Sequence, residues 1–78
     1  MPTVVPEWLL TERRATGDRI RRLRGTHGLT QERLGEGAGI ARKTISRIEV
    51  GTSPADHDQL VKIANALGVP LWRLFWDG

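Results

Sequence analysis

The chain has 78 residues, of which 38% are hydrophobic, and it carries a formal net charge of +3. This length allows one small domain with a thin core, and the absence of cysteine excludes disulfides and thiolate metal sites. No apolar run approaches the roughly 18 residues of a membrane span, and residues 1–10 lack the basic and apolar regions of a secretory signal. We therefore expect a cytoplasmic protein with no membrane association.

Charge is distributed unevenly along the chain. Residues 13–47 hold ten Arg or Lys against three Asp or Glu, whereas the rest of the chain holds two against six. Most of these cations are Arg, whose guanidinium group matches phosphates and guanine edges. The pattern indicates a basic face and a polyanionic partner, although a solvated basic surface explains the charge alone equally well.

The N-terminal part of the chain divides into an arm and a helix. Residues 1–10 contain two prolines and the apolar cluster Trp8-Leu9-Leu10, and we interpret them as an N-terminal arm before a domain spanning residues 11–78. The first helix is expected from Thr11 to Thr26, with Gly28 ending the segment.

Two short helices are expected next, at residues 31–38 and about 41–50. Thr30 stands at the N-cap position of the first, and Gly39 separates the two by supplying a positive φ. Gly35 permits close approach of the two helices, whereas Gly37 is expected to be exposed without such a role. The apolar positions that would pin this pair against the rest of the domain are Leu34, Ala38, Ile40, Ile45 and Ile48.

Two further helices complete the expected fold. Asp56 and Gln59 form a capping box for a helix at about residues 57–67, and Gly68 ends it. Pro70 then starts a short fifth helix, whose apolar residues are Leu71, Leu74 and Phe75. No stretch alternates apolar and polar residues as a strand would, so the sequence predicts a compact all-α domain of five helices.

The helix at about residues 41–50 carries a cationic outer surface. At 100° per residue, Ile45 and Ile48 define its inner side, while Lys43, Ser46 and Arg47 point outward and Arg42 lies at the edge of the first turn. A short helix with such a surface fits the major groove of B-DNA, which is about 12 Å wide, and its Arg side chains can donate bidentately to guanine.

Four stretches carry a resemblance to a known family: GDRIRRLR, GLTQERLG, GIARKTISRIEVG and LVKIANALGVPLWRLF, which together cover about residues 17–75. The chain resembles the Cro/phage-repressor type (XRE-like) of helix-turn-helix regulators. This resemblance implies a lambda-repressor-like five-helix domain whose second and third helices form the helix-turn-helix. It also implies sequence-specific binding to double-stranded DNA, commonly as a homodimer on a palindrome, and regulation of transcription, for which we expect repression.

The resemblance also implies roles for individual residues. The residues expected to read bases are Arg42, Lys43, Ser46 and Arg47, and those expected to contact phosphates are Thr30, Gln31, Arg33 and Thr44. Arg24 and Glu49 match an ion pair that ties the first helix to the end of the third. Ala41 departs from the family pattern, because a Ser or Thr cap is usual there.

Trp72 and Trp76 lie four residues apart and have two interpretations of equal weight. They either pack on the N-terminal arm with Trp8 or form a homodimer interface. The second supports an alternative function, in which an antitoxin-like or adaptor module uses this aromatic C-terminal region to bind another protein. A possible protein partner therefore stays open.

The sequence contains no constellation typical of an enzyme. His27 and His57 lack the spacing of metal ligands, and Ser46 has no basic or acidic partner at a distance suited to a nucleophile. Lys43 is not preceded by Gly, so the core of a phosphate-binding Gly-Lys-Thr motif is missing. We expect no catalysis, no metal and no cofactor.

Overall fold

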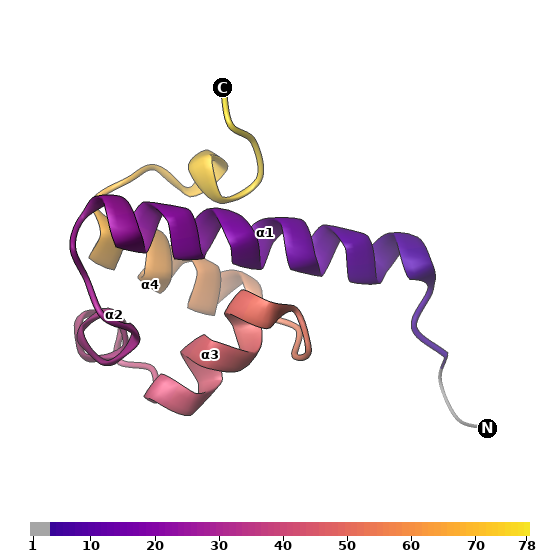
Figure 1. Ribbon diagram of the computed structural model, residues 1–78, viewed down its shortest axis with the longest axis horizontal. Helices are drawn as coiled ribbons and strands as arrows, with labels where there is room; N and C mark the ends of the chain where they lie inside the picture. Colours follow the sequence, from indigo (N-terminus) through magenta and orange to yellow (C-terminus); the bar gives the residue numbers. More distant parts are fainter. Residues whose placement is uncertain (1–3) are drawn as a thin grey trace.

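The computed structural model describes residues 4–78, which form four α-helices and one 3₁₀ turn without a strand. The α-helices are α1 (Glu7–Thr26), α2 (Gln31–Ala38), α3 (Arg42–Val50) and α4 (His57–Leu67), and the 3₁₀ turn is η1 (Leu71–Leu74). In Figure 1, α1 spans the molecule, α2 and α3 lie on one side of it and η1 lies on the other. The prediction of an all-α domain is confirmed.

The prediction of a fifth α-helix is wrong. The backbone after Pro70 makes bonds typical of a 3₁₀ turn, from Arg73 N to the Pro70 oxygen and from Phe75 N to the Trp72 oxygen, both 3.0 Å long. With three residues per turn, Leu71 and Leu74 share one side, and Leu74 is fully buried. Phe75 directly follows this turn and points to a different side from Leu71 and Leu74. It is 48% exposed, although the sequence analysis grouped it with those two as an apolar residue of the fifth helix.

Helix α1 begins four residues earlier than the sequence predicted. Pro6 occupies its N-cap position, and the Pro6 carbonyl accepts hydrogen bonds from the backbone nitrogens of Leu9 and Leu10. The fixed φ of proline suits a helix start, so the helix continues through residues assigned to the arm. Residues 1–3 of that arm lie outside the described residues, and the division at residue 10 stays a prediction.

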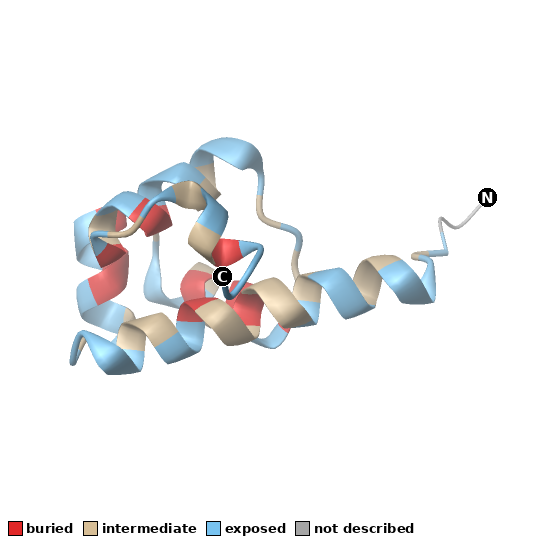
Figure 2. Cartoon of the chain, turned by 90° about the horizontal axis from the view of Figure 1, so that it is seen from above, coloured by how far each residue is buried: buried red, intermediate tan, exposed pale blue. Residues whose placement is uncertain are grey.

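One buried cluster joins all five elements. Its fully buried large side chains are Ile20, Leu34, Ile45, Ile63, Leu67 and Leu74, and Figure 2 shows buried segments concentrated at this junction. Of the apolar residues predicted to pin the helix pair, Ile40 is only half-buried and the others are buried. The first turns of α1 project beyond this core.

The turn between α2 and α3 follows the predicted glycine pattern. Gly39 has φ 67°, and a Cβ on Gly35 would collide with the carbonyl oxygen of Ile40. Gly37 is exposed, as predicted. The Asp56–Gln59 capping box is also present at the start of α4. The turn at Gly39 and the close approach at Gly35 fix how α2 and α3 cross.

Between residues 4 and 78, no helix combines the length and apolar character needed to cross a membrane. The same residues contain no group of three or more His, Cys, Asp and Glu side chains arranged to hold a metal ion.

Candidate nucleic-acid interface

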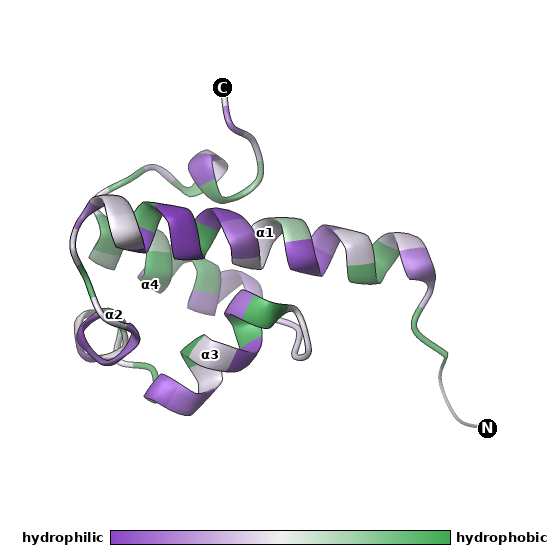
Figure 3. Cartoon of the chain, in the orientation of Figure 1, coloured by the Kyte–Doolittle hydropathy of each residue, from purple (hydrophilic) through white to green (hydrophobic). Residues whose placement is uncertain are grey.

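Helix α3 presents a cationic surface to solvent. Its inner side is anchored by Ile45 and Ile48, both buried against the core. On its outer side, Arg42, Lys43 and Arg47 are exposed and Ser46 is half-buried; we call these four residues the reading face. Figure 3 shows the hydrophilic first turn of α3 on the side away from α1.

The cations of the reading face have no carboxylate partner among residues 4–78. Arg42, Lys43 and Arg47 take part in none of the salt bridges there, whereas Arg19, Arg21, Arg22 and Arg24 of α1 all do. Guanidinium and ammonium groups without an internal partner keep all their donors available to a ligand. The reading face can therefore bind an anionic or hydrogen-bond-accepting surface without first breaking an ion pair.

The N-terminus of α2 lies next to α3 and adds a second anion-binding element. Thr30 is its N-cap, and the Thr30 Oγ1 accepts a hydrogen bond of 3.0 Å from the backbone nitrogen of Arg33. The Arg33 side chain is exposed, and it has no carboxylate partner among residues 4–78. The first backbone N–H groups of a helix lack partners within it, and the helix dipole is positive at this end. Together these groups suit a phosphate.

A buried carboxylate ties α3 to the rest of the molecule. The Glu49 side chain is only 2% exposed and binds Arg24 through two bonds, Nε to Oε2 at 2.7 Å and Nη2 to Oε1 at 3.0 Å. The predicted ion pair is thereby confirmed. Arg24 Nη1 also donates to the Leu29 carbonyl at 3.0 Å. Hydrogen bonding to Glu49 raises the pKa of the Arg24 guanidinium above its ordinary value, so this side chain is charged at neutral pH.

The pattern of α2 and α3 matches a known protein family. The model of that family, described as helix-turn-helix, aligns with residues 20–71 of this chain. The chain belongs to the helix-turn-helix family. This membership confirms the resemblance to XRE-like regulators that the sequence suggested.

Relatives of this helix-turn-helix chain come from several bacteria. An uncharacterized HTH-type transcriptional regulator of Sinorhizobium medicae is 39% identical over 61 residues, which are 78% of this chain and 44% of that protein. The uncharacterized HTH-type transcriptional regulator YgzD of Bacillus subtilis is 32% identical over 59 residues, 76% of this chain and 89% of its own length. The chain thus spans less than half the length of the Sinorhizobium relative.

Solved structures share the same helix-turn-helix fold. The restriction-modification controller protein C.AhdI of Aeromonas hydrophila has a TM-score of 0.82 and 31% identity, with 83% of this chain and 98% of that chain covered. The clp gene regulator ClgR of C. glutamicum has a TM-score of 0.76 and 26% identity, with 80% of each chain covered.

Gln31 takes a role in the helix-turn-helix that the sequence analysis missed. Its Nε2 donates a hydrogen bond of 3.1 Å to Glu49 Oε1, so it is the second side chain that holds the buried carboxylate. The only signal for this role in the sequence was indirect: if Glu49 is buried, its carboxylate needs several hydrogen-bond donors from other residues. The phosphate contact of Gln31 stays a prediction, now assigned to its backbone N–H and its remaining amide hydrogen.

Gly17 is another residue whose role the sequence did not show. It is buried where α1 crosses the end of α3, and a Cβ there would collide with the carbonyl oxygens of Ile48 and Glu49. From the sequence, Gly17 only weakens a helix. The structure shows that it allows α1 and the helix-turn-helix to approach closely.

Three further arginines of α1, Arg19, Arg21 and Arg22, also have carboxylate partners. Arg19 and Arg22 each lie 3.3 Å from Asp77, which follows η1, and Arg21 lies 2.6 Å from Asp18. Because η1 is on the opposite side of α1 from α3, the Asp77 pairs lie away from the reading face (Figure 1).

The C-terminal tryptophans remain accessible. The ring centroids of Trp72 and Trp76 are 5.9 Å apart, and the two residues are 49% and 64% exposed. Trp8 is 69% exposed, so the three indoles do not bury one another. The pair stays a candidate interface.

The last two positions named from the sequence, Ala41 and Thr44, lie at the start of α3. Thr44 is half-buried in the first turn of α3. Ala41 occupies the N-cap position of α3 without a side-chain hydrogen bond, as its departure from the family pattern implies. The first N–H groups of α3 therefore have no capping side chain.

Proposed function

We propose that this helix-turn-helix chain is a sequence-specific, DNA-binding transcriptional regulator whose helix α3 enters the major groove. The observation that carries the proposal is the reading face: three exposed cations that have no carboxylate partner among residues 4–78, on a helix whose opposite side is buried in the core. A polyanion with hydrogen-bond acceptors in a wide groove is the ligand that this surface fits.

The proposal divides the contacts by chemistry. Arg42, Lys43, Ser46 and Arg47 read base edges, where Arg binds guanine O6 and N7 bidentately. Thr30, Gln31, Arg33 and Thr44 hold the phosphate backbone and set the register of α3 in the groove. The Glu49 network keeps these two groups in fixed relative positions, because it joins the start of α2 to the end of α3.

We expect a repressor, since a domain seated in the groove excludes other proteins from the same bases. Two copies would occupy half-sites about 34 Å apart, one turn of the double helix. The proposal includes no catalysis and no cofactor.

Salt dependence tests the electrostatic part of this function. Fluorescence anisotropy measures the affinity for a random-sequence duplex at rising NaCl concentrations. The affinity should fall, and a plot of log K against log salt should have a slope of about −0.9 for each neutralised phosphate. Arg33→Ala should make this slope shallower by about one unit, because it removes one phosphate contact.

Arg73→Ala is the matched control for that titration. It removes the same charge from η1, on the opposite side of α1, where the guanidinium lies over the Trp72 ring. We expect wild-type DNA affinity for it. An affinity independent of salt, or an equal loss in both variants, would contradict the proposal.

A second candidate function is a protein-interaction module, favoured by the exposed Trp72–Trp76 pair. In that case DNA affinity would be weak and nearly independent of sequence. Replacing both tryptophans with Ala would abolish partner binding while leaving the reading face intact.

A further inference from the structure

A polar pocket lies between α1 and η1, on the side of α1 opposite the reading face (Figure 1). It has a volume of about 220 Å³. Arg19 and Arg22 of α1 and Arg73 of η1 line it, and Asp77 is the one acidic residue in its described lining. Three guanidinium groups and one carboxylate leave two positive charges in excess, so the pocket is electrostatically suited to a further anion.

The Asp77 carboxylate binds these arginines loosely. A single oxygen, Oδ1, accepts from both Arg19 Nε and Arg22 Nη2, and each distance is 3.3 Å. Charge-assisted N–H···O bonds are usually about 2.7–2.9 Å long. In the Arg24–Glu49 pair, by contrast, the two carboxylate oxygens each accept one bond, at 2.7 Å and 3.0 Å. The Asp77 contact therefore leaves room for a ligand that fits the arginines better.

The pocket lacks acceptor oxygens rather than donors. Each guanidinium carries five N–H donors. Arg73 forms no salt bridge among residues 4–78, and Arg22 has one further partner, with its Nε 3.3 Å from Asp18 Oδ2. The Arg19 side chain is only 18% exposed, so its donors are partly withdrawn from water and gain from an acceptor inside the pocket.

We propose that this pocket binds a phosphate dianion, and that the Asp77 carboxylate competes with it for the same guanidinium groups. A phosphate group carries about −1.5 to −2 charges at pH 7 and has three strong acceptor oxygens, which match the excess charge and the surplus of donors. Arginine suits this ligand because its planar fork donates to two oxygens at once. Asp77 is 62% exposed and follows η1 in a segment without regular structure, so its carboxylate can leave without breaking a helix.

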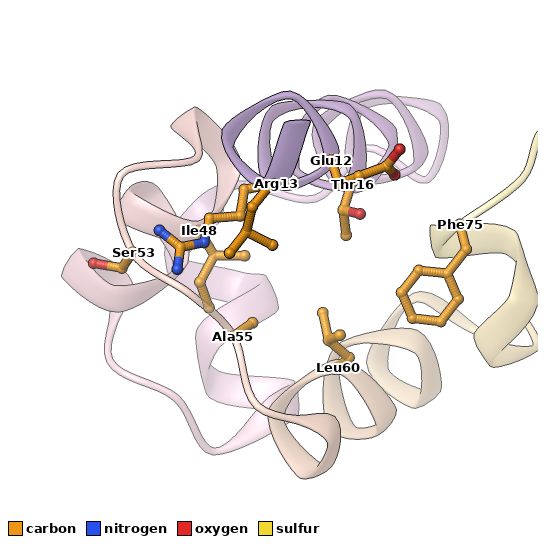
Figure 4. Close-up of a pocket in the computed structure, with 9 residues that line it drawn as sticks. Glu12, Arg13, Thr16, Ile48, Ser53, Ala55, Leu60 and Phe75 are labelled. Carbon is orange, nitrogen blue, oxygen red and sulfur yellow. The ribbon is translucent and has the colours of Figure 1, made fainter. Parts of the chain in front are cut away.

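A second pocket, between α1, α4 and Phe75, lacks this chemistry (Figure 4). Its volume is similar, about 210 Å³, but its lining is mainly apolar. Arg13 and Glu12 both line it, so no charge is in excess there. Arg13 is thus a matched control: it is an arginine of α1 at a pocket of similar size, and it forms no salt bridge among residues 4–78.

An NMR titration of the ¹⁵N-labelled chain with inorganic phosphate, at constant ionic strength and about pH 7, tests the site. The backbone amide signals of Arg19, Arg22 and Asp77 should shift saturably, with a Kd of about 1 mM or lower. Arg22→Ala should raise this Kd about tenfold or more, because hydrogen bonds to a charged ligand are lost. Asp77→Asn should lower it about two- to fivefold, because the competing carboxylate is removed.

Controls separate this site from general anion binding. Arg13→Ala should keep the wild-type Kd, and thermal unfolding of each variant checks that the fold is intact. Sodium acetate should produce no saturable shift, because Asp77 already supplies a carboxylate. Ribose 5-phosphate presents the same dianion on a small phosphorylated metabolite, so whichever of the two phosphate probes binds more tightly identifies the source of the group.

Four results would each overturn the inference. The first is the absence of saturable shifts with both phosphate probes in the wild type and in Asp77→Asn. The second is equal affinity for acetate and phosphate, and the third is an equal loss of phosphate affinity in Arg22→Ala and Arg13→Ala. The fourth is weaker phosphate binding by Asp77→Asn, which would contradict competition by the carboxylate. The titration contains no DNA, so its outcome is independent of the proposed function.

Discussion

Replacing Glu49 with Ala should lower the free energy of unfolding by about 3–5 kcal/mol. The carboxylate is 2% exposed and accepts hydrogen bonds from Arg24 and Gln31. Without it, the Arg24 guanidinium, itself only 18% exposed, stays in the protein with no opposite charge. Small domains are stabilised by about 5–15 kcal/mol, so a large share of the total would be lost. Urea unfolding followed by circular dichroism measures the change.

A double variant is the control for the Glu49 prediction. Combining Arg24→Leu with Glu49→Leu removes both charges and preserves apolar volume, so it should cost less than Glu49→Ala alone. If the double variant instead lost the sum of the two single losses, the pair would behave as two independent side chains. That result would contradict a coupled, shielded ion pair.

Gly17→Ala should also destabilise the protein, by about 1–3 kcal/mol. The added methyl group meets the carbonyl oxygens of Ile48 and Glu49, which are backbone atoms and cannot rotate away. This loss outweighs the gain of up to about 1 kcal/mol that Ala normally brings to a helix interior. A thermal unfolding curve should show the lower midpoint.

Gly25→Ala provides the matched comparison within α1. A Cβ at Gly25 meets no atom within 4 Å, and the residue is exposed. We therefore expect Gly25→Ala to be as stable as the wild type or slightly more stable. Equal stability of the two variants would show that the crossing of α1 and α3 tolerates a side chain at Gly17.

Helix periodicity made the reading face predictable from the sequence. Ile45 and Ile48 alone determine which side of α3 is buried, and the cations follow from that geometry. The turn was predictable for a similar reason, because the positive φ at Gly39 and the close approach at Gly35 are met best by glycine.

Contacts between distant segments were not predictable in the same way. The Arg24–Glu49 pair followed only from the family resemblance, and the Gln31 hydrogen bond and the crossing at Gly17 followed from nothing local. The ion pair and the crossing depend on how α1 meets the end of α3, and the Gln31 bond depends on how the start of α2 meets it. No periodicity encodes either arrangement. Phe75 was misplaced because the sequence does not distinguish a 3₁₀ turn from the first turn of an α-helix.

Selection of bound sites from a random duplex pool, carried out with the wild type and with Arg47→Ala, tests the central claim most directly. We expect a consensus containing guanine for the wild type, and for Arg47→Ala a loss of about 1–3 kcal/mol on that site together with relaxed base preference at one position of each half-site. Arg73→Ala should reproduce the wild-type consensus. An Arg47→Ala protein that selects the same consensus with unchanged affinity would contradict the assignment of α3 as the reading helix.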